Sequence, residues 1–404
     1  MGKRKLDYSD DEQETYTQHY ITETNDNTIT NNKKYKSTSN TNTNTNNNNN
    51  KTSKNKKKKK KNNKNQNKNI KSEFKIYSSA EHSEYLDKIS LQWQKEYSRH
   101  ICYRNRLMVL DDLKRRVFNS KNKLFKDYIF SLGIFGSSVY GMATVNSDID
   151  FYLDIEGVPS KPKKFMYKLS DSLSYLGYKV YNTIWQARIP IIKFYDPYNQ
   201  FHCDLAVTSN LISLANADLI QSYDRIDSRF KPLVVFIKMW AEKRQMLDGS
   251  LFISSFSWIN LIIHYFQSVS IFPSLYLKSD SQLYLDKEPR ILNGINCIYN
   301  DQNLDQYALE QQNQQNFAQL LLGFFQYYLK FDFYHNAIST RHLQVVKKPK
   351  DEKTDFKQLY IHCFFDYSHN LTKGLNHKKL QIILNEMKKT ETALLNCKPL
   401  NTLI

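Results

Sequence analysis

The sequence predicts an α+β protein, with one mixed β-sheet in its first globular part and a set of helices in its second. Three observations indicate this. Short apolar runs typical of strands lie between positions 132 and 207. Longer amphipathic stretches with helical periodicity lie between 216 and 395. Upstream of both, the chain from Thr24 to Lys71 contains no Val, Leu, Phe, Trp or Met.

The first 75 residues are predicted to be a disordered tail rich in Asn and Lys. A segment so poor in apolar side chains cannot offset the entropy lost when its backbone is ordered. Inside it, Lys56 to Lys61 is an unbroken basic run. Such a run fits a nuclear-import signal or an electrostatic contact to nucleic acid, and it fits a solvated low-complexity tract equally well.

Two folded parts are expected after the tail, residues 76–215 with the sheet and residues 216–404 with the helices. The segment 81–121 has helical periodicity and is expected to pack on the second part. A helix near 164–176 is expected to cross between strands, and no internal repeat is evident. The predicted strands are 132–135, 149–155, 178–181, 190–195 and 202–207, and the predicted later helices are 216–223, 230–244, 253–267, 316–331 and 378–395.

The charge of the chain favours a polyanionic partner. The net charge is +18, of which the tail carries about +10 and the remainder about +8, so nucleic acid fits both portions. No run of eighteen apolar residues exists, and the N-terminus lacks an apolar signal segment. We therefore expect a soluble intracellular protein, nuclear or cytoplasmic, without a membrane partner.

The cysteines suggest neither a disulfide framework nor a zinc site, because none of them has C-x-x-C spacing. They indicate a reducing compartment. The five are Cys102, Cys203, Cys297, Cys363 and Cys397.

The most informative stretch joins a glycine turn to two carboxylates at strand spacing. Gly136 and Ser137 form a turn whose backbone amides can approach phosphate. Asp148 and Asp150 follow, and they share one face because side chains alternate along a strand. Asp204, inside a later apolar strand, would complete the shells of two Mg²⁺ (or Mn²⁺) ions. This combination is what metal-dependent nucleotidyl transfer requires.

The globular part resembles the terminal uridylyltransferases and noncanonical poly(A) polymerases, a branch of the DNA polymerase β-like nucleotidyltransferase superfamily. The resemblance runs from about Asp87 to Leu395. Besides the motifs above, it rests on residues 187–194, on the helical segment 233–244 and on residues 320–333.

The resemblance implies a palm-like nucleotidyltransferase domain over residues 76–215, a helical central and poly(A)-polymerase-associated domain over residues 216–404, and an active cleft between them. It also implies that Asp148 and Asp150 hold both metal ions, and that Asp204 mainly holds the ion that activates the RNA 3′-hydroxyl.

Further residues are implied to bind the nucleotide. Gly136 and Ser137 would meet its terminal phosphates. Lys238 would neutralise the triphosphate, with Lys243 as a candidate substitute for a second basic residue, since Glu242 stands at the family's usual position.

The ribose and the base are implied to meet residues of the second part. Asn216 would contact the ribose, although Ala217 replaces a threonine of the family pattern. Ser255 would meet phosphate. Phe256 would stack on the base without the phenolic hydrogen bond of the usual tyrosine.

Base choice is implied to depend on Asp366 and His369, which match a family motif that reads uracil. A histidine there can donate to a pyrimidine carbonyl and crowd out a purine, which favours UTP over ATP. Cys363 and Phe364 replace the acid and the proline of that motif.

The sequence thus predicts an enzyme that adds nucleotides, UMP from UTP, to RNA 3′ ends without a template. Three alternatives stay open: a poly(A) polymerase that uses ATP, a catalytically silent RNA-binding scaffold, and a 2′-5′ oligonucleotide synthetase or another small-molecule nucleotidyltransferase. The three intact carboxylates disfavour the scaffold, and the helical segment disfavours the last. The composition of the tail resembles that of protist proteins, which suggests an RNA-dependent RNA polymerase or another RNA-processing protein as a partner in small-RNA production.

Overall fold

The computed structural model describes residues 80–102, 106–119, 124–125, 128–156, 162–186, 189–208, 211–249, 251–310, 312–349 and 358–404. The predictions for the tail, including Lys56 to Lys61, and for residues 187–188 lie outside these ranges. Within them, every helix is too short or too polar to span a bilayer.

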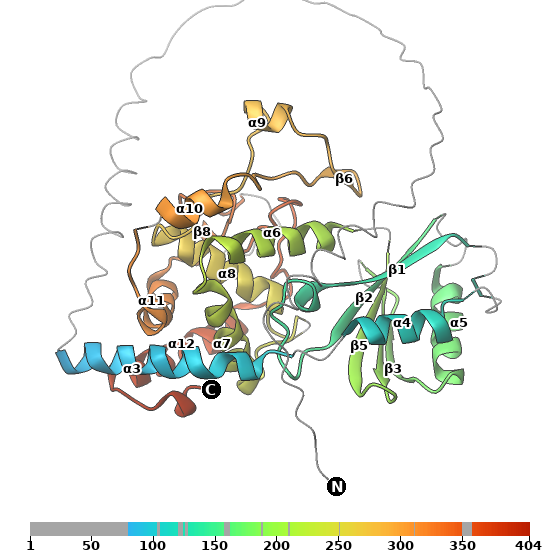
Figure 1. The fold of residues 1–404 in the computed structure, drawn as a ribbon, viewed down its shortest axis with the longest axis horizontal. Helices are drawn as coiled ribbons and strands as arrows, with labels where there is room; N and C mark the ends of the chain where they lie inside the picture. The colour runs from blue at the N-terminus through green and yellow to red at the C-terminus, as the bar shows by residue number, and fades with distance from the viewer. Residues whose placement is uncertain are drawn as a thin grey trace, which may run out of the picture. The chain divides into compact units, whose positions relative to one another are not determined.

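One mixed five-stranded sheet forms the first part of the fold (Figure 1). Its strands lie in the order β1-β2-β5-β4-β3, and only β2 and β5 run parallel to each other. The predicted mixed sheet and the α+β class are confirmed. The strands are β1 (Phe130–Phe135), β2 (Ile149–Ile155), β3 (Lys179–Ile184), β4 (Ile191–Asp196) and β5 (Phe201–Val207).

The two faces of this sheet differ sharply. One face buries apolar side chains against helices α4 (Arg106–Arg116) and α5 (Pro162–Tyr175), which form one hydrophobic cluster with the strands. Residues 149, 151, 153 and 155 of β2 are buried there, and the residues between them are only partly buried. The opposite face, which we call the open face, carries polar side chains, and the candidate site lies on it.

The helical part has a core of its own. The later predicted helices are all present, with ends shifted by a few residues at most. The longer helices are α3 (Ala80–Glu96), α6 (Ile212–Ile226), α7 (Phe230–Lys243), α8 (Ser255–Ser268), α11 (Phe317–Lys330) and α12 (His377–Leu395), with single turns at η1 (Tyr97–His100) and η3 (Leu400–Thr402).

Aromatic side chains link these helices. Trp240 of α7 lies edge-on against Trp258 of α8, with ring centroids 5.6 Å apart. Trp93 of α3 packs on Phe236 of α7 at 5.2 Å and donates its indole N–H to the Pro232 carbonyl at 3.0 Å. The helix α3 therefore belongs to the core of the second part, while α4, which follows it, belongs to the sheet. The position of a domain boundary, expected at 215/216, remains a prediction.

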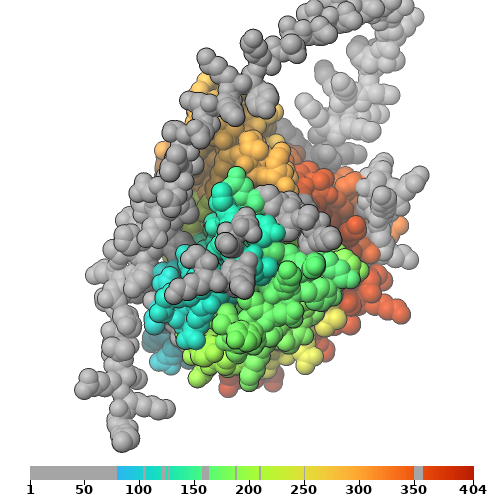
Figure 2. Space-filling view, turned by 90° about the vertical axis from the view of Figure 1, so that its right-hand side faces the viewer, coloured from blue at the N-terminus to red at the C-terminus, as the bar shows by residue number. Residues whose placement is uncertain are grey.

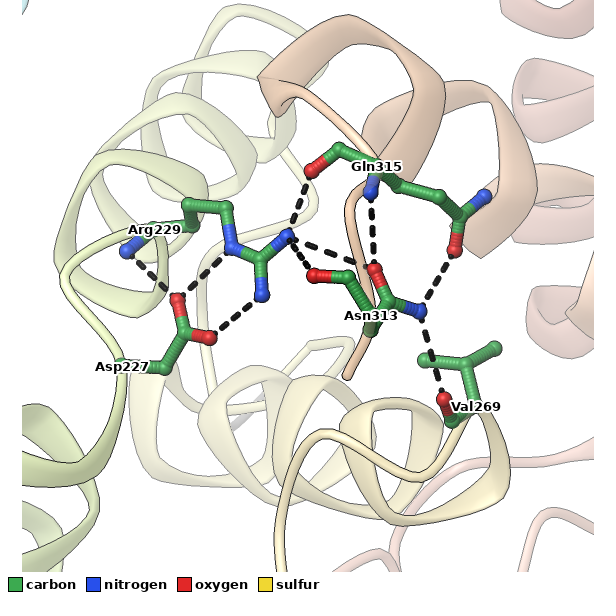
Figure 3. A network of polar contacts seen from close by, with 5 residues as sticks. All are labelled: Asp227, Arg229, Val269, Asn313 and Gln315. Atoms are coloured by element: carbon green, nitrogen blue, oxygen red, sulfur yellow. Dashed lines mark hydrogen bonds and ion pairs between the residues drawn. The ribbon is translucent and has the colours of Figure 1, made fainter. Parts of the chain in front are cut away.

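A polar network ties four helix ends together (Figure 3). The Arg229 guanidinium binds both carboxylate oxygens of Asp227, at 2.9 and 2.5 Å, where α6 passes into α7. It also donates to the carbonyls of Asn313 and Gln315, which precede α11, at 3.0 and 2.6 Å. The Asn313 amide donates in turn to the Val269 carbonyl after α8 at 3.3 Å. The network fixes the positions of α6, α7, α8 and α11 relative to one another.

The segment 279–310 contains short elements that periodicity does not predict. They are α9 (Gln282–Leu285), a hairpin of β6 (Ile291–Leu292) and β7 (Ile295–Asn296), and α10 (Leu304–Glu310). A second small hairpin pairs β8 (Asn336–Ala337) with β9 (Val346–Lys347). Arg290 joins the first hairpin to α6 through an ion pair with Asp218 at 2.6 Å.

Candidate active site

A tight turn follows β1 and lies directly against the carboxylates. This turn, η2 (Gly136–Ser138), closes with the Val139 N–H donating to the Gly136 carbonyl at 3.0 Å. Gly136 has φ +71°, and a Cβ added there would lie 2.5 Å from Asp150 Oδ2. Only glycine combines this backbone conformation with so close an approach to the carboxylate. Ser137 is buried in the turn.

The sheet register brings the three predicted carboxylates together. Asp150 on β2 and Asp204 on β5 are direct partners in the parallel pairing. Neighbouring strands lie about 4.8 Å apart, so these two side chains project side by side from the open face. Asp148 stands two residues before Asp150 and shares its face. Asp150 and Asp204 from the two paired strands and Asp148 from the residue before β2 therefore lie near one another, with Asp150 against Gly136.

Burial and the neighbouring charges raise the proton affinity of two of these carboxylates, Asp148 and Asp150. Burial, then the negative charges of Asp204 and Asp148, raise the pKa of Asp150 to about 7. Burial and the charge of Asp204 also raise the pKa of Asp148. The ammonium of Lys193, the β4 partner of Asp204 in the sheet, forms an ion pair with Asp204 Oδ2. Asp204 Oδ1 is buried without a hydrogen-bond partner.

The residues of this spot fit divalent metal ions. Across the described ranges, no three His, Cys, Asp or Glu side chains form a preassembled metal centre. In this arrangement Asp204 contacts Lys193 instead. Yet two carboxylates with raised pKa and an orphaned buried carboxylate oxygen are the conditions that a hard cation relieves, and carboxylates are the ligands that Mg²⁺ prefers. Asp148, Asp150 and Asp204 are the residues that would hold such ions.

Lys238 of α7 reaches this spot from the helical part. Its ammonium donates to the Met142 carbonyl at 2.7 Å and to the Ser147 hydroxyl at 3.3 Å. The side chain is only 2% exposed, so it is not a solvated helix face. Burial lowers the pKa of Lys238 to about 8, although the negative charge of Asp150 raises it in part. A buried cation therefore faces the carboxylates.

A second buried cation, Arg106 on α4, was not predicted from the sequence. Its guanidinium donates to the Ser138 hydroxyl at 3.0 Å, to the Asp148 carbonyl at 3.0 Å and to the Ser147 carbonyl at 3.1 Å. It thus ties the turn η2 to the residues just before β2. Two of its three acceptors are backbone carbonyls, which leave no signature in a sequence.

Asn216 lies on α6, which packs against the end of the turn. The Gln221 amide of the same helix donates to the Val139 carbonyl at 3.0 Å. Asn216 Oδ1 is buried and has no hydrogen-bond partner. This oxygen is an acceptor that a hydroxyl of a bound ligand could satisfy.

Lys243 is not brought beside Lys238. Five residues along a helix turn the side chain by about 140°, and Lys243 is exposed in the last turn of α7. Glu242, at the i+4 position from Lys238, lies on the same side of the helix. Its negative charge raises the pKa of Lys238 and so offsets part of the lowering by burial.

Ser255 and Phe256 form the first turn of α8. The helix is capped by the Ser254 hydroxyl, which accepts from the Ser257 N–H at 3.2 Å. Ser255 is half-buried, and Phe256 is partly buried against the helical core, so part of its ring remains available.

Asp366 and His369 belong to one tight turn. The His369 N–H donates to the Asp366 carbonyl at 2.9 Å, and the Cys363 N–H donates to the His369 carbonyl at 3.0 Å. The Ser368 hydroxyl donates to the Asp366 carboxylate at 2.9 Å. Arg341 fixes the start of the turn by donating to the Phe365 carbonyl at 2.8 Å. The loop is therefore well defined despite its departures from the family motif.

Comparison with known proteins finds two matching family models and several relatives. The model described as "Poly(A) RNA polymerase, mitochondrial-like, central palm domain" matches residues 89–225, and the model described as "Cid1 family poly A polymerase" matches residues 316–373. Caffeine-induced protein 16 of Schizosaccharomyces pombe is 32% identical over 271 residues, which cover 64% of this chain and 22% of that protein. Poly(A) RNA polymerase GLD2 of Homo sapiens is 27% identical over 296 residues, which cover 68% of this chain and 58% of that protein.

Solved structures agree. A crystal structure of the Cid1 poly(U) polymerase with bound MgGTP superposes with a TM-score of 0.65 at 25% identity, covering 78% of this chain and 98% of that one. The structure of Cid1 with its short product ApU superposes with a TM-score of 0.62 at 25% identity, covering 76% and 94%.

The fold, a mixed sheet with an associated helical part, is the nucleotidyltransferase fold of these solved structures. More narrowly, the two family models, the relatives and the solved structures confirm the resemblance to the terminal uridylyltransferases and noncanonical poly(A) polymerases that the sequence motifs predicted. The matched region spans less than two thirds of the length of these two curated relatives.

Proposed function

We propose that this protein is an RNA 3′-terminal nucleotidyltransferase that adds UMP from UTP without a template. The observation that carries the proposal is the pairing of Asp150 with Asp204 across β2 and β5, with Asp148 beside them and the Gly136 turn against Asp150. The comparisons support the same reaction, since a relative is named a poly(A) RNA polymerase and a similar solved structure is named a poly(U) polymerase.

The triphosphate would bind between the turn and α7. Gly136 and Ser137 would offer backbone amides to its phosphates, and Lys238 would supply a buried positive charge. Since Lys238 now donates to the Met142 carbonyl, part of its hydrogen bonding would pass to the ligand. Asn216 Oδ1, buried and unpartnered, is suited to accept from a ribose hydroxyl.

The carboxylates would hold two divalent ions, with Asp148 and Asp150 shared and Asp204 mainly at the side of the RNA 3′-hydroxyl. Bound there, such ions would lower the pKa of that hydroxyl and neutralise the departing pyrophosphate. The raised pKa of Asp150, about 7, reflects its burial and then the negative charges of Asp204 and Asp148, which bound cations would offset. The ion pair between Lys193 and Asp204 would break or be shared with the bound ion, and the Lys193 ammonium would remain nearby as a positive charge.

The preference for UTP is proposed from the turn that contains Asp366 and His369. This turn is linked to the nucleotide side of the site through α6. Phe365 packs on Tyr299 at 6.1 Å between centroids, and the Tyr299 hydroxyl lies 3.0 Å from the Ser222 hydroxyl of α6. Because α6 also carries Asn216, the base-reading turn and the ribose contact would act on one nucleotide. Phe256 would stack on its base, and Ser255 and Lys243 remain candidate phosphate contacts.

ATP is the alternative nucleotide, since several relatives are named poly(A) RNA polymerases. The two are separated by incubating the purified chain with a labelled RNA oligonucleotide and each of the four nucleoside triphosphates in turn. We expect extension with UTP to exceed extension with ATP by roughly tenfold or more, the size of one well-placed hydrogen bond to a base edge. Preferred use of ATP would overturn the base choice and leave the reaction class intact.

The residue that sets this choice is tested with His369→Ala. The substitution should reduce the UTP preference, and His335→Ala, exposed elsewhere on the second part, is the control that should not. Unchanged preference in His369→Ala would remove the residue from base reading. An RNA-dependent RNA polymerase partner and a nuclear or cytoplasmic location stay predictions from the sequence.

A further inference from the structure

The open face of the sheet carries a group of aromatic and basic side chains beyond Asp204. Tyr181 lies on β3, Tyr195 on β4 and His202 on β5. Tyr195 and His202 are direct sheet partners with ring centroids 5.1 Å apart, and Tyr181 stands edge-on to His202 at 5.9 Å. The ammonium of Lys179 lies 5.8 Å from the Tyr195 ring centroid. We call these four residues the aromatic patch.

The aromatic patch is a surface and not a piece of core. Tyr181 is 54% exposed, Lys179 and His202 are exposed, and Tyr195 is half-buried. The hydrophobic cluster of the sheet lies on the opposite face. Figure 2 views the sheet part, coloured cyan to green, from the right-hand side of Figure 1, the side on which α5 lies. The exposed rings of Tyr181 and His202 on this face of the sheet are therefore accessible to a ligand.

The register places the aromatic patch next to the carboxylates. Lys179, Tyr195 and His202 form one row across β3, β4 and β5, and the next row two residues on contains Lys193 and Asp204. Electrostatics report the same proximity, because burial and then the charges of Asp204 and Asp148 raise the pKa of Tyr181.

The patch lies on the side from which a nucleophile must come. The turn at Gly136 follows β1, at the opposite edge of the sheet from β3, and it adjoins Asp150. If the pyrophosphate leaves toward that turn and Lys238, in-line attack requires the RNA 3′-hydroxyl to approach across β5 and β4. The bases of the RNA 3′ end then lie over the aromatic patch.

We propose that the aromatic patch binds the last bases of a single-stranded RNA 3′ end by stacking, with Lys179 and Lys193 near its phosphates. This inference rests on the proposed function, in which RNA is the acceptor. Stacking suits an enzyme without a template, since every base offers a flat face. The positive charges of Lys179 and Lys193 complement the RNA backbone.

The test uses the full chain and a short single-stranded RNA with 2-aminopurine as its 3′-terminal base, whose fluorescence falls on stacking. No nucleoside triphosphate is present. Wild type should quench this probe strongly and quench the same RNA labelled at its 5′ end weakly. Tyr181→Ala and Tyr195→Ala should each weaken RNA binding by roughly 5- to 100-fold and lose the quenching. Tyr181→Phe and Tyr195→Phe keep the ring and should bind as wild type does.

The matched control is Tyr175→Ala, a 91% exposed tyrosine at the end of α5, which should change nothing. Equal quenching by wild type and by Tyr181→Ala would overturn the proposal, as would an effect confined to the KM for UTP. Tyr181→Ala is the decisive variant because the Tyr181 side chain is exposed, so its removal should leave the fold intact. Incorporation of UMP is measured separately, so failure of the proposed function and failure of the patch give different results.

Discussion

Replacing Gly136 by alanine should separate stability from activity at the centre of the site. Two costs can be worked out from the structure. Gly136 has φ +71°, a conformation that costs a residue with a Cβ about 1–2 kcal/mol. The added Cβ would also stand 2.5 Å from Asp150 Oδ2, whereas ordinary contact begins at 3.4 Å. The carboxylate must therefore move by roughly 1 Å.

The fold can accept that movement because the clashing atom is the end of a side chain. Catalysis cannot, because a displacement of about 1 Å at a reacting group costs on the order of 100-fold in rate. We expect Gly136→Ala to lose about 1–3 kcal/mol of unfolding free energy by urea denaturation. Its UMP incorporation should fall at least roughly 100-fold under conditions where the protein is fully folded.

The matched control is Gly294→Ala in the β6–β7 hairpin. Gly294 has φ +74°, and nothing lies within 4 Å of an added Cβ. This variant should show a similar stability loss from the backbone alone and keep wild-type activity. If Gly136→Ala retains activity within about threefold of wild type, a close glycine–carboxylate approach is not needed, and the reasoning from this contact is refuted.

Two further predictions concern the buried cations. The pKa of Lys238 is about 8 in the folded protein and 10.5 in the unfolded chain, so between these pH values the unfolded chain binds the extra proton. Raising the pH from 8 to 10.5 should therefore increase the unfolding free energy of the wild type, relative to that of Lys238→Met, by up to roughly 3 kcal/mol. Urea denaturation at both pH values measures this, and a constant difference would contradict it. Arg106→Lys cannot reproduce the three hydrogen bonds of the guanidinium, so kcat should fall roughly tenfold or more. Arg115→Lys, exposed on the same helix, should have wild-type kcat, and equal kcat in both variants would contradict the positioning role of Arg106.

The sequence predicts well the helices and strands that follow from the pattern of neighbouring residues. The alternation around Asp148 and Asp150 identifies β2, and the helical periodicities identify α7, α8, α11 and α12. The strand predicted at 178–181 is found as β3 at Lys179–Ile184, where an irregularity between Val180 and Asn182 breaks the simple alternation. The helix predicted from 216 begins at Ile212, whose side chain is buried in the helical core.

Pairings between distant segments could not be predicted from periodicity. The direct partnership of Asp150 with Asp204 depends on a parallel strand pairing that spans α5, β3 and β4. Arg106 looks like a solvated residue of an amphipathic helix until its carbonyl partners are seen. The aromatic patch arises because the register of three strands aligns Lys179, Tyr195 and His202, and the irregularity of β3 at Tyr181 brings that ring beside His202.

The central claim is that Asp148, Asp150 and Asp204 act together on metal-assisted transfer of a nucleotide to RNA. Single-turnover incorporation of labelled UMP by Asp204→Asn tests it most directly, with Asp171→Asn on the exposed side of α5 as control. We predict that Asp204→Asn stays folded and loses activity by roughly 1000-fold, while the control matches wild type. Activity of Asp204→Asn within about tenfold of wild type would contradict the account.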